Sequence, residues 1–211
     1  MPLLGIQPPL AADEVDDLLY FTRVNELQDL QDTLSELAQK YDYPVKDIVM
    51  NAVDPKSRNT LLHYSSANGL DGLLKSILSL VSVPSETNEA VSADSAVIAW
   101  VNTANAEGNT ALHWAALNGH VEVVKTLIDA GVDIWVKNAN GDMALFEAER
   151  AERTAVVQTL LDASLKKADK GETEHLPLAA DIFRSEQEDS SGGVNAGSQA
   201  NEGAEADMSG T

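Results

Sequence analysis

Histidine is the residue type in this chain best suited to catalysis or metal binding, and it occurs four times, at positions 63, 113, 120 and 175. No two of these form a His-x-x-x-His pair, the spacing that places two metal ligands on one face of a helix. His113 and His120 are separated by Asn118-Gly119, a dipeptide typical of a helix break. His63 and His113 each follow a threonine by three residues, a pattern that favours a structural role over a chemical one.

Other catalytic arrangements are also missing from the sequence. Glu147 and Glu149 resemble an acid–base pair, but residues two apart on a helix do not face each other. The chain has no G-x-S-x-G nucleophile motif, no P-loop and no dinucleotide-binding fingerprint. Because it has no cysteine, disulfides and cysteine-ligated metals are excluded. We therefore expect no enzyme activity, no cofactor and no metal site.

The elements that would carry these residues repeat along the chain. Gly108 and Gly141, like Val124 and Val157, are pairs of identical residues 33 positions apart. NTLLHYSSANG (59–69) matches NTALHWAALNG (109–119) at an offset of 50, which is one period plus an insertion of 17 residues placed between about 81 and 97. A turn–helix–turn–helix unit that recurs at this spacing predicts an all-α solenoid.

Four repeat units are predicted, at 14–54, 55–104, 105–137 and 138–165. The first and last are degenerate and more polar, as expected where one face of a terminal repeat meets water. Residues 1–13 are Pro-rich and predicted to be a flexible N-terminus. Residues 166–211 are predicted to be a mostly disordered acidic tail, because large apolar residues are too sparse there to offset the entropy of ordering.

These units resemble ankyrin repeats. GNTALHWAALNGHVEVVKTLIDAGVDIWV follows the family's G-x-T-P-L-H-x-A-A-x-x-G-H-x-E-V-V-x-x-L-L-x-x-G-A-D-V-N pattern almost throughout, with Ala111 in place of proline and Trp135 in place of asparagine. The resemblance implies about four helix–turn–helix repeats with short loop fingers. It also implies that the repeat histidine hydrogen-bonds to the threonine before it and to the neighbouring loop.

A narrower resemblance is to the small fungal ankyrin-repeat chaperones dedicated to small-subunit ribosomal protein three. It is carried by NTALHWAALNG, by the insertion upstream of it, and by LFEAE in the last repeat ahead of an acidic tail. It implies a non-enzymatic escort that keeps the newly made ribosomal protein soluble until 40S assembly, in the cytoplasm and the nucleus. The alternatives are a generic ankyrin adaptor in signalling or transcription and an acidic histone-type chaperone.

The charge of the chain favours the same class of partner. A formal net charge of −20 at pH 7 repels nucleic acid backbones and anionic membranes and attracts basic proteins. We expect a monomer that forms a heterodimer with a basic protein, without direct contact to nucleic acid or membrane. The resemblance implies that this partner is ribosomal protein three, bound through its N-terminal region. Solubility alone is the other explanation for such a charge.

Partner-binding residues are predicted on the first helix of each repeat, which in ankyrin proteins lines the concave face, and on the fingers. The position after the repeat histidine holds Tyr20, Tyr64, Trp114 and Glu147 in successive units, and stacking would align these in one row. Partner contact and packing are both open for the aromatic residues, with contact favoured for Trp114 because tryptophan is a frequent interface anchor. Trp135 on a finger is a second candidate anchor.

An acidic wall able to pair with lysine or arginine is predicted from Glu107, Asp142, Glu147 and Glu149. The remaining candidates are Asn109 and Leu117.

Overall fold

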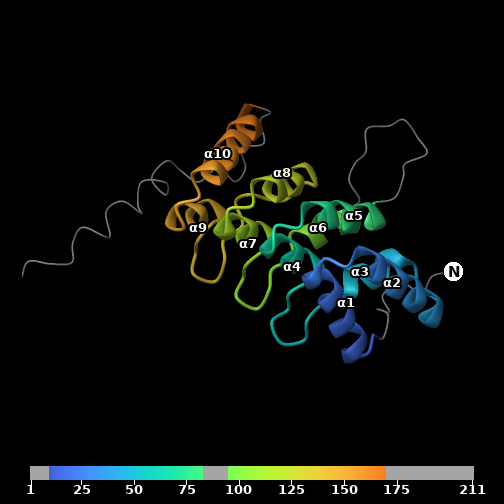
Figure 1. The fold of residues 1–211 in the computed structure, drawn as a ribbon. Coiled ribbons are helices and arrows are strands. Elements are labelled where there is room, and N and C mark those ends of the chain that lie inside the picture. The colour runs from blue at the N-terminus through green and yellow to red at the C-terminus, as the bar shows by residue number, and fades with distance from the viewer. Residues whose placement is uncertain (1–9, 83–94, 170–211) are drawn as a thin grey trace, which may run out of the picture. The chain divides into compact units, whose positions relative to one another are not determined.

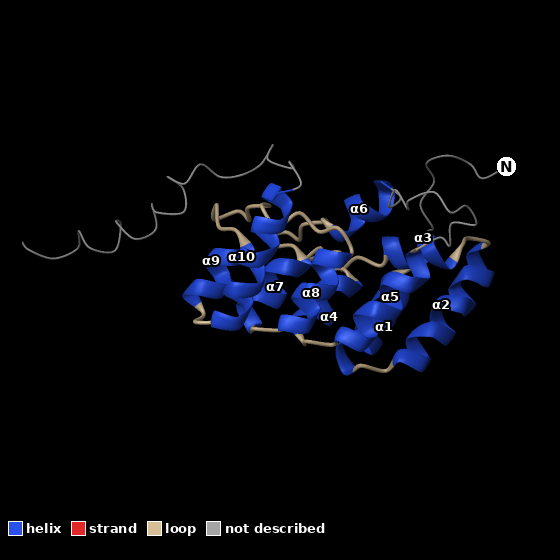
Figure 2. Cartoon of the chain, turned by 90° about the horizontal axis from the view of Figure 1, so that it is seen from above, coloured by secondary structure: helices blue, strands red, loops and turns tan. Residues whose placement is uncertain are grey.

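The computed structural model describes residues 10–82 and 95–169 of the chain, all within one compact unit. These residues form ten α-helices and two isolated antiparallel bridges, Val53 with Thr60 and Lys137 with Met143 (Figure 1; Figure 2). The helices are α1 (Ala12–Val24), α2 (Leu27–Tyr41), α3 (Val45–Asn51), α4 (Leu61–Ala67), α5 (Asp71–Val81), α6 (Ser95–Val101), α7 (Ala111–Asn118), α8 (Val121–Asp129), α9 (Ala144–Arg150) and α10 (Thr154–Asp169).

The third repeat shows why the sequence forms helix pairs. In α8, Val123, Val124 and Leu127 fall on one side of the helix and are buried, while the exposed Glu122 and Lys125 form an ion pair on the other side. The preceding helix, α7, is capped at its C-terminal end by Gly119, which has a φ of 84°. Glycine enters this left-handed region without the steric cost that a Cβ imposes, so the chain reverses between the two helices at this point.

Within the described unit the helices pack in two rows. In the first row α1 packs on α4, α4 on α7 and α7 on α9, and we call these four the inner helices. In the second row α3 packs on α5, α5 on α8 and α8 on α10. Leu18, Leu74 and Leu127, from three successive repeats, are fully buried in the one core cluster between the rows. The predicted all-α ankyrin solenoid is therefore confirmed.

Three loop fingers precede the inner helices α4, α7 and α9, at residues 52–60, 102–110 and 130–143 (Figure 1). Each finger is joined to the next by a backbone hydrogen bond: the amide of Ala106 donates to the carbonyl of Ser57 at 2.9 Å, and the amide of Ala139 donates to the carbonyl of Glu107 at 3.0 Å. The fingers thus continue the repeat stacking beyond the helices.

The structure differs from the sequence prediction at the unit boundaries. Helix α1 begins at Ala12, inside the segment predicted to be flexible, and α10 continues to Asp169, beyond the predicted end of the repeats at 165. The 33-residue pattern does not predict α3, and a further helix, α6, begins at Ser95 near the end of the insertion placed between about 81 and 97. Most of the predicted N-terminus and tail lies outside the described residues.

Candidate partner-binding surface

The repeat histidines tie each inner helix to the next finger. In the second repeat, the Thr60 amide donates to Nδ1 of His63 at 3.1 Å, and His63 Nε2 lies 2.9 Å from the carbonyl oxygen of Asn109. A carbonyl can only accept, so Nε2 carries the proton and Nδ1 is the acceptor. The third repeat has the same arrangement, from Thr110 through His113 to the carbonyl of Asp142 at 3.1 Å. The expected threonine–histidine–loop bonding is confirmed.

Burial keeps both histidines neutral. It lowers the pKa of His63 to about 4, and it also lowers the pKa of His113. Each ring already uses both nitrogens within the fold, so neither histidine is available to a substrate or a metal. The fourth repeat has Met143 and Phe146 in place of the threonine and histidine. No described finger follows α9 that could accept such a hydrogen bond.

Asparagine side chains form a second link between fingers. Asn105 Nδ2 donates to Asn59 Oδ1 at 2.9 Å, and Asn138 Nδ2 donates to Asn109 Oδ1 at 2.9 Å. The Nδ2 of Asn109 lies 3.3 Å from an oxygen of Glu107. Asn109, which is predicted to bind a partner, uses its side chain for hydrogen bonds to Glu107 and Asn138, and the second of these bonds connects neighbouring fingers.

The predicted aromatic row contains three different environments. Tyr20 on α1 is 55% exposed, the most accessible member. Tyr64 on α4 is half-buried: its hydroxyl donates to Asp54 at 3.1 Å, and the guanidinium of Arg23 lies 4.6 Å from its ring centroid. Trp114 on α7 is also half-buried, and its indole N–H is buried without a hydrogen-bond partner among the described residues. Trp114 can therefore offer a partner its ring but not its N–H in this conformation.

The acidic wall is partly neutralised by an arginine of the same chain. Arg150 lies 2.7 Å from Asp142 and 3.5 Å from Glu147. Glu147 was expected to face solvent, but it is 9% exposed and also accepts a hydrogen bond from Asn138 at 3.1 Å. A buried charge is costly without hydrogen-bonding partners, and Asn138 and Arg150 supply these partners to the Glu147 carboxylate. Glu107 and Glu149 are exposed, as the prediction requires.

The other two candidates lie closer to the core than a free surface anchor would. Trp135 is half-buried and packs against the core cluster, with its amide donating to Asp133 at 2.9 Å. This position agrees with packing between fingers, the alternative that the sequence left open. Leu117 is half-buried near the end of α7, where its carbonyl accepts a hydrogen bond from Arg153 at 3.1 Å.

The contacts of two arginines on the inner-helix face, Arg150 and Arg23, were not predicted from the sequence. Arg150 is three residues after Glu147, a helical spacing that could have suggested their ion pair. No sequence signal connects Arg23 to Tyr64, because they lie on different helices and meet only when α1 packs on α4. We use the term inner-helix face for the surface made by Tyr20, Tyr64, Trp114, Glu107, Asp142, Glu149 and these two arginines.

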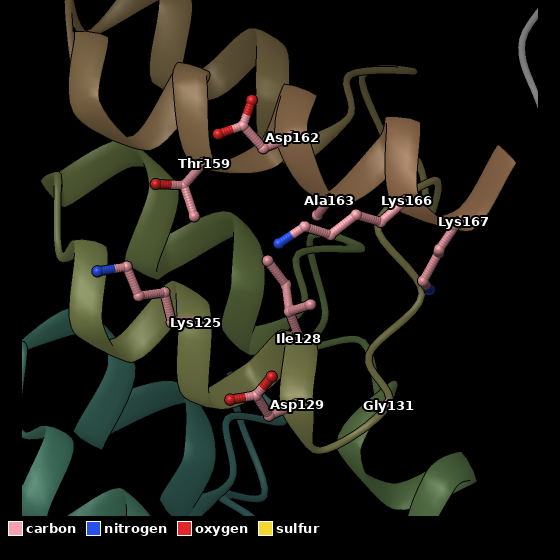
Figure 3. A pocket seen from close by; sticks show the side chains of 9 residues that line it. All are labelled: Lys125, Ile128, Asp129, Gly131, Thr159, Asp162, Ala163, Lys166 and Lys167. Carbon is pink, nitrogen blue, oxygen red and sulfur yellow. The ribbon is translucent and has the colours of Figure 1, made fainter. Parts of the chain in front are cut away.

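A separate groove lies between α8 and α10 (Figure 3). It has a volume of about 750 Å³ and is lined by three lysines and two aspartates among smaller side chains. The hydroxyl of Thr159, the only hydroxyl in this lining, donates to a backbone carbonyl of its own helix. The groove therefore contains no activated nucleophile and no histidine.

The described residues contain no cluster of three or more histidine, aspartate or glutamate side chains able to hold a metal ion. Among these same residues, no helix has the length and apolar character needed to cross a membrane.

The comparisons with known proteins agree with this architecture. The family model for ankyrin repeats (3 copies) matches residues 28–138 and 62–174. A chain in the crystal structure of the yeast ribosomal protein Rps3 in complex with its chaperone Yar1 is 33% identical, with a TM-score of 0.62. That match covers 73% of this chain and 95% of the other. No curated protein sequence gives a significant match. Repeats of this kind and this structural neighbour indicate a protein-interaction scaffold, and the chain belongs to the ankyrin-repeat family.

Proposed function

We propose that this chain is a dedicated chaperone that binds a newly made, basic small-subunit ribosomal protein, the counterpart of Rps3, and keeps it soluble until 40S assembly. The observation that carries the proposal is the 33% identity to a chain of the Rps3–Yar1 complex over 95% of that chain's length. Likeness over nearly a whole chain supports a shared partner better than likeness limited to one repeat.

The charge of the chain supports a basic partner independently. Its net charge of −20 would speed the approach of a cationic protein and would compete with RNA for it. A chaperone of this kind would accompany its partner from the cytoplasm to the nucleus as a one-to-one complex. A histone is also basic, so charge alone does not distinguish a histone from a basic ribosomal protein as the partner.

The inner-helix face supplies the contacts for such a partner. Tyr20 offers exposed aromatic surface, and Glu107 on a finger and Glu149 on α9 are exposed acidic residues. An amphipathic basic segment would bury its apolar side against the aromatic residues and place its cations against the acids. Replacement of an aromatic residue of this face and replacement of one of its acids should therefore each weaken binding of the partner.

Binding of purified yeast Rps3 tests the proposal. Size-exclusion chromatography with light scattering should show a one-to-one complex, and calorimetry should show an affinity that weakens at least about tenfold between low and high salt. Core histones, used at equal concentration, should bind more weakly. Absence of a stoichiometric complex with Rps3, or equal binding to histones, would refute the dedicated role and leave a general adaptor or a histone chaperone.

A matched pair of variants locates the site. Tyr20→Ala should weaken Rps3 binding at least about fivefold, as expected for an aromatic interface anchor. Leu165→Ala removes a side chain that is 68% exposed on α10 and should leave the affinity unchanged. Both side chains are outside the core, so loss of folding should not confuse the comparison. Equal effects of the two substitutions would contradict a site on the inner-helix face.

A further inference from the structure

Arg150 lies on the solvent side of two carboxylates, those of Asp142 on the inner-helix face and of the buried Glu147. Its two terminal nitrogens reach different acids: Nη2 lies 2.7 Å from Asp142 and Nη1 lies 3.5 Å from Glu147. The arginine side chain is 57% exposed, whereas those of Asp142 and Glu147 are 27% and 12% exposed. The cation is therefore the outermost and most easily moved member of this cluster.

The two acids are held in place by contacts that do not involve Arg150. The Asp142 amide donates to Asn138 Oδ1 at 3.0 Å, and its carbonyl accepts from His113 at 3.1 Å. Glu147 lies on α9 and accepts a hydrogen bond from Nδ2 of Asn138 at 3.1 Å. Removal of the guanidinium would therefore leave the backbone of Asp142 and the carboxylate of Glu147 in place, and the Asp142 carboxylate would be free to accept another cation.

We propose that Arg150 is an internal placeholder for a cation of the partner: in the free protein it occupies the Asp142–Glu147 pair, and on binding an arginine of the partner displaces it. This inference rests on the proposed basic partner and goes beyond it, because it makes Arg150 a residue that sets specificity. Only a partner cation that reaches both carboxylates can replace a guanidinium that already bridges them. Scattered lysines on other proteins would meet a site whose two negative charges Arg150 already compensates in part.

The exchange of cations should cost little. An exposed ion pair contributes weakly because water and salt screen it, so displacing Arg150 should reduce the affinity of the partner by only about two- to fivefold. That reduction disappears when Arg150 is removed. Arg150→Gln should thus tighten binding by about two- to fivefold, although it deletes a polar contact of the binding surface.

The test compares Arg150→Gln with Lys166→Gln. Both remove one positive charge, but Lys166 lies on α10 in the separate groove of Figure 3. Calorimetry with two probes, purified Rps3 and a hexa-arginine peptide, should show tighter binding to the Arg150 variant and a change of less than about 1.5-fold for the Lys166 variant, because salt screens distant charges. In an Asp142→Asn background, the gain from Arg150→Gln should be lost.

The possible results separate the two proposals. If Rps3 does not bind but the peptide binds the Arg150 variant more tightly, the chaperone role fails and the placeholder role stands. If Rps3 binds the wild-type chain and Arg150→Gln binds it equally or more weakly, the placeholder role is overturned and the chaperone role stands. Equal gains from both variants would show a general charge effect and would also overturn it. Thermal unfolding of Arg150→Gln should stay within a few degrees of the wild type, and a larger loss would mark Arg150 as structural instead.

Discussion

Acid should destabilise the repeats through His63. The side chain is 2% exposed, and burial lowers its pKa in the folded state to about 4 from an ordinary value of 6.5. The unfolded chain therefore binds a proton at a higher pH than the folded chain does. Stability from this residue is complete above pH 6.5 and is lost progressively as the pH falls towards 4.

The size of the loss follows from the two pKa values. Between pH 7 and pH 5, protonation of the unfolded state favours unfolding by about 2 kcal/mol through His63 alone. The lowered pKa of His113 acts in the same direction. A loss of this size is a large fraction of the stability of a small domain.

A comparison with His63→Gln isolates this contribution. Glutamine does not titrate and can still donate to the Asn109 carbonyl. It lacks the ring that also accepts from the Thr60 amide, so the variant should be less stable than the wild type at pH 7. Urea unfolding followed by circular dichroism at pH 7 and pH 5 gives the stability gap between the two proteins. Carboxylates affect both proteins alike, so the gap should narrow by about 2 kcal/mol at pH 5.

A gap of equal size at both pH values would refute this reasoning, because His63 would then titrate alike in the folded and unfolded states. His175→Gln, which changes the same residue type outside the described residues, controls for loss of a histidine. It should give the wild-type pH dependence.

Two further predictions concern the fingers. Gly108→Ala should destabilise the protein by about 1–3 kcal/mol, because the residue has a φ of +77° and a Cβ there would lie 2.6 Å from the backbone nitrogen of Ala139. Gly72→Ala on α5, where a Cβ meets no atom within 4 Å, should be neutral or stabilising in the same thermal melts. Asn138→Ala should lower the free energy of unfolding in urea by about 2–3 kcal/mol, because it leaves the amide of Asp142 without its partner and removes the hydrogen bond from Asn138 to Glu147. A loss below about 0.5 kcal/mol would show that water replaces Asn138.

Much of the fold could be predicted from local sequence. The turn at Gly119, the apolar spacing of Val123, Val124 and Leu127, and the threonine–histidine pattern each act over a few residues. A 33-residue period then requires that equivalent helices stack. Helices α3 and α6 were harder to predict because they lie in insertions, where no second repeat confirms the pattern.

The candidate site could be predicted only in outline. The sequence identified the row that contains Tyr20 and Tyr64, but it did not indicate that Arg23 covers the second ring. It identified Glu147 as an acid of the inner helices and treated it as exposed. Glu147 is buried beside the finger residue Asn138, which precedes α9 in the chain and donates a hydrogen bond to the Glu147 carboxylate.

The sequence by itself determined the helical repeats, the structural role of the repeat histidines and the acidic character of the chain, because periodicity, capping and charge are properties of composition and short-range order. Only the tertiary structure decided which predicted contacts remain accessible. Exposure is set by side chains from other helices and fingers, and the same packing that aligns the inner helices also brings Arg23 onto Tyr64 and encloses the indole N–H of Trp114.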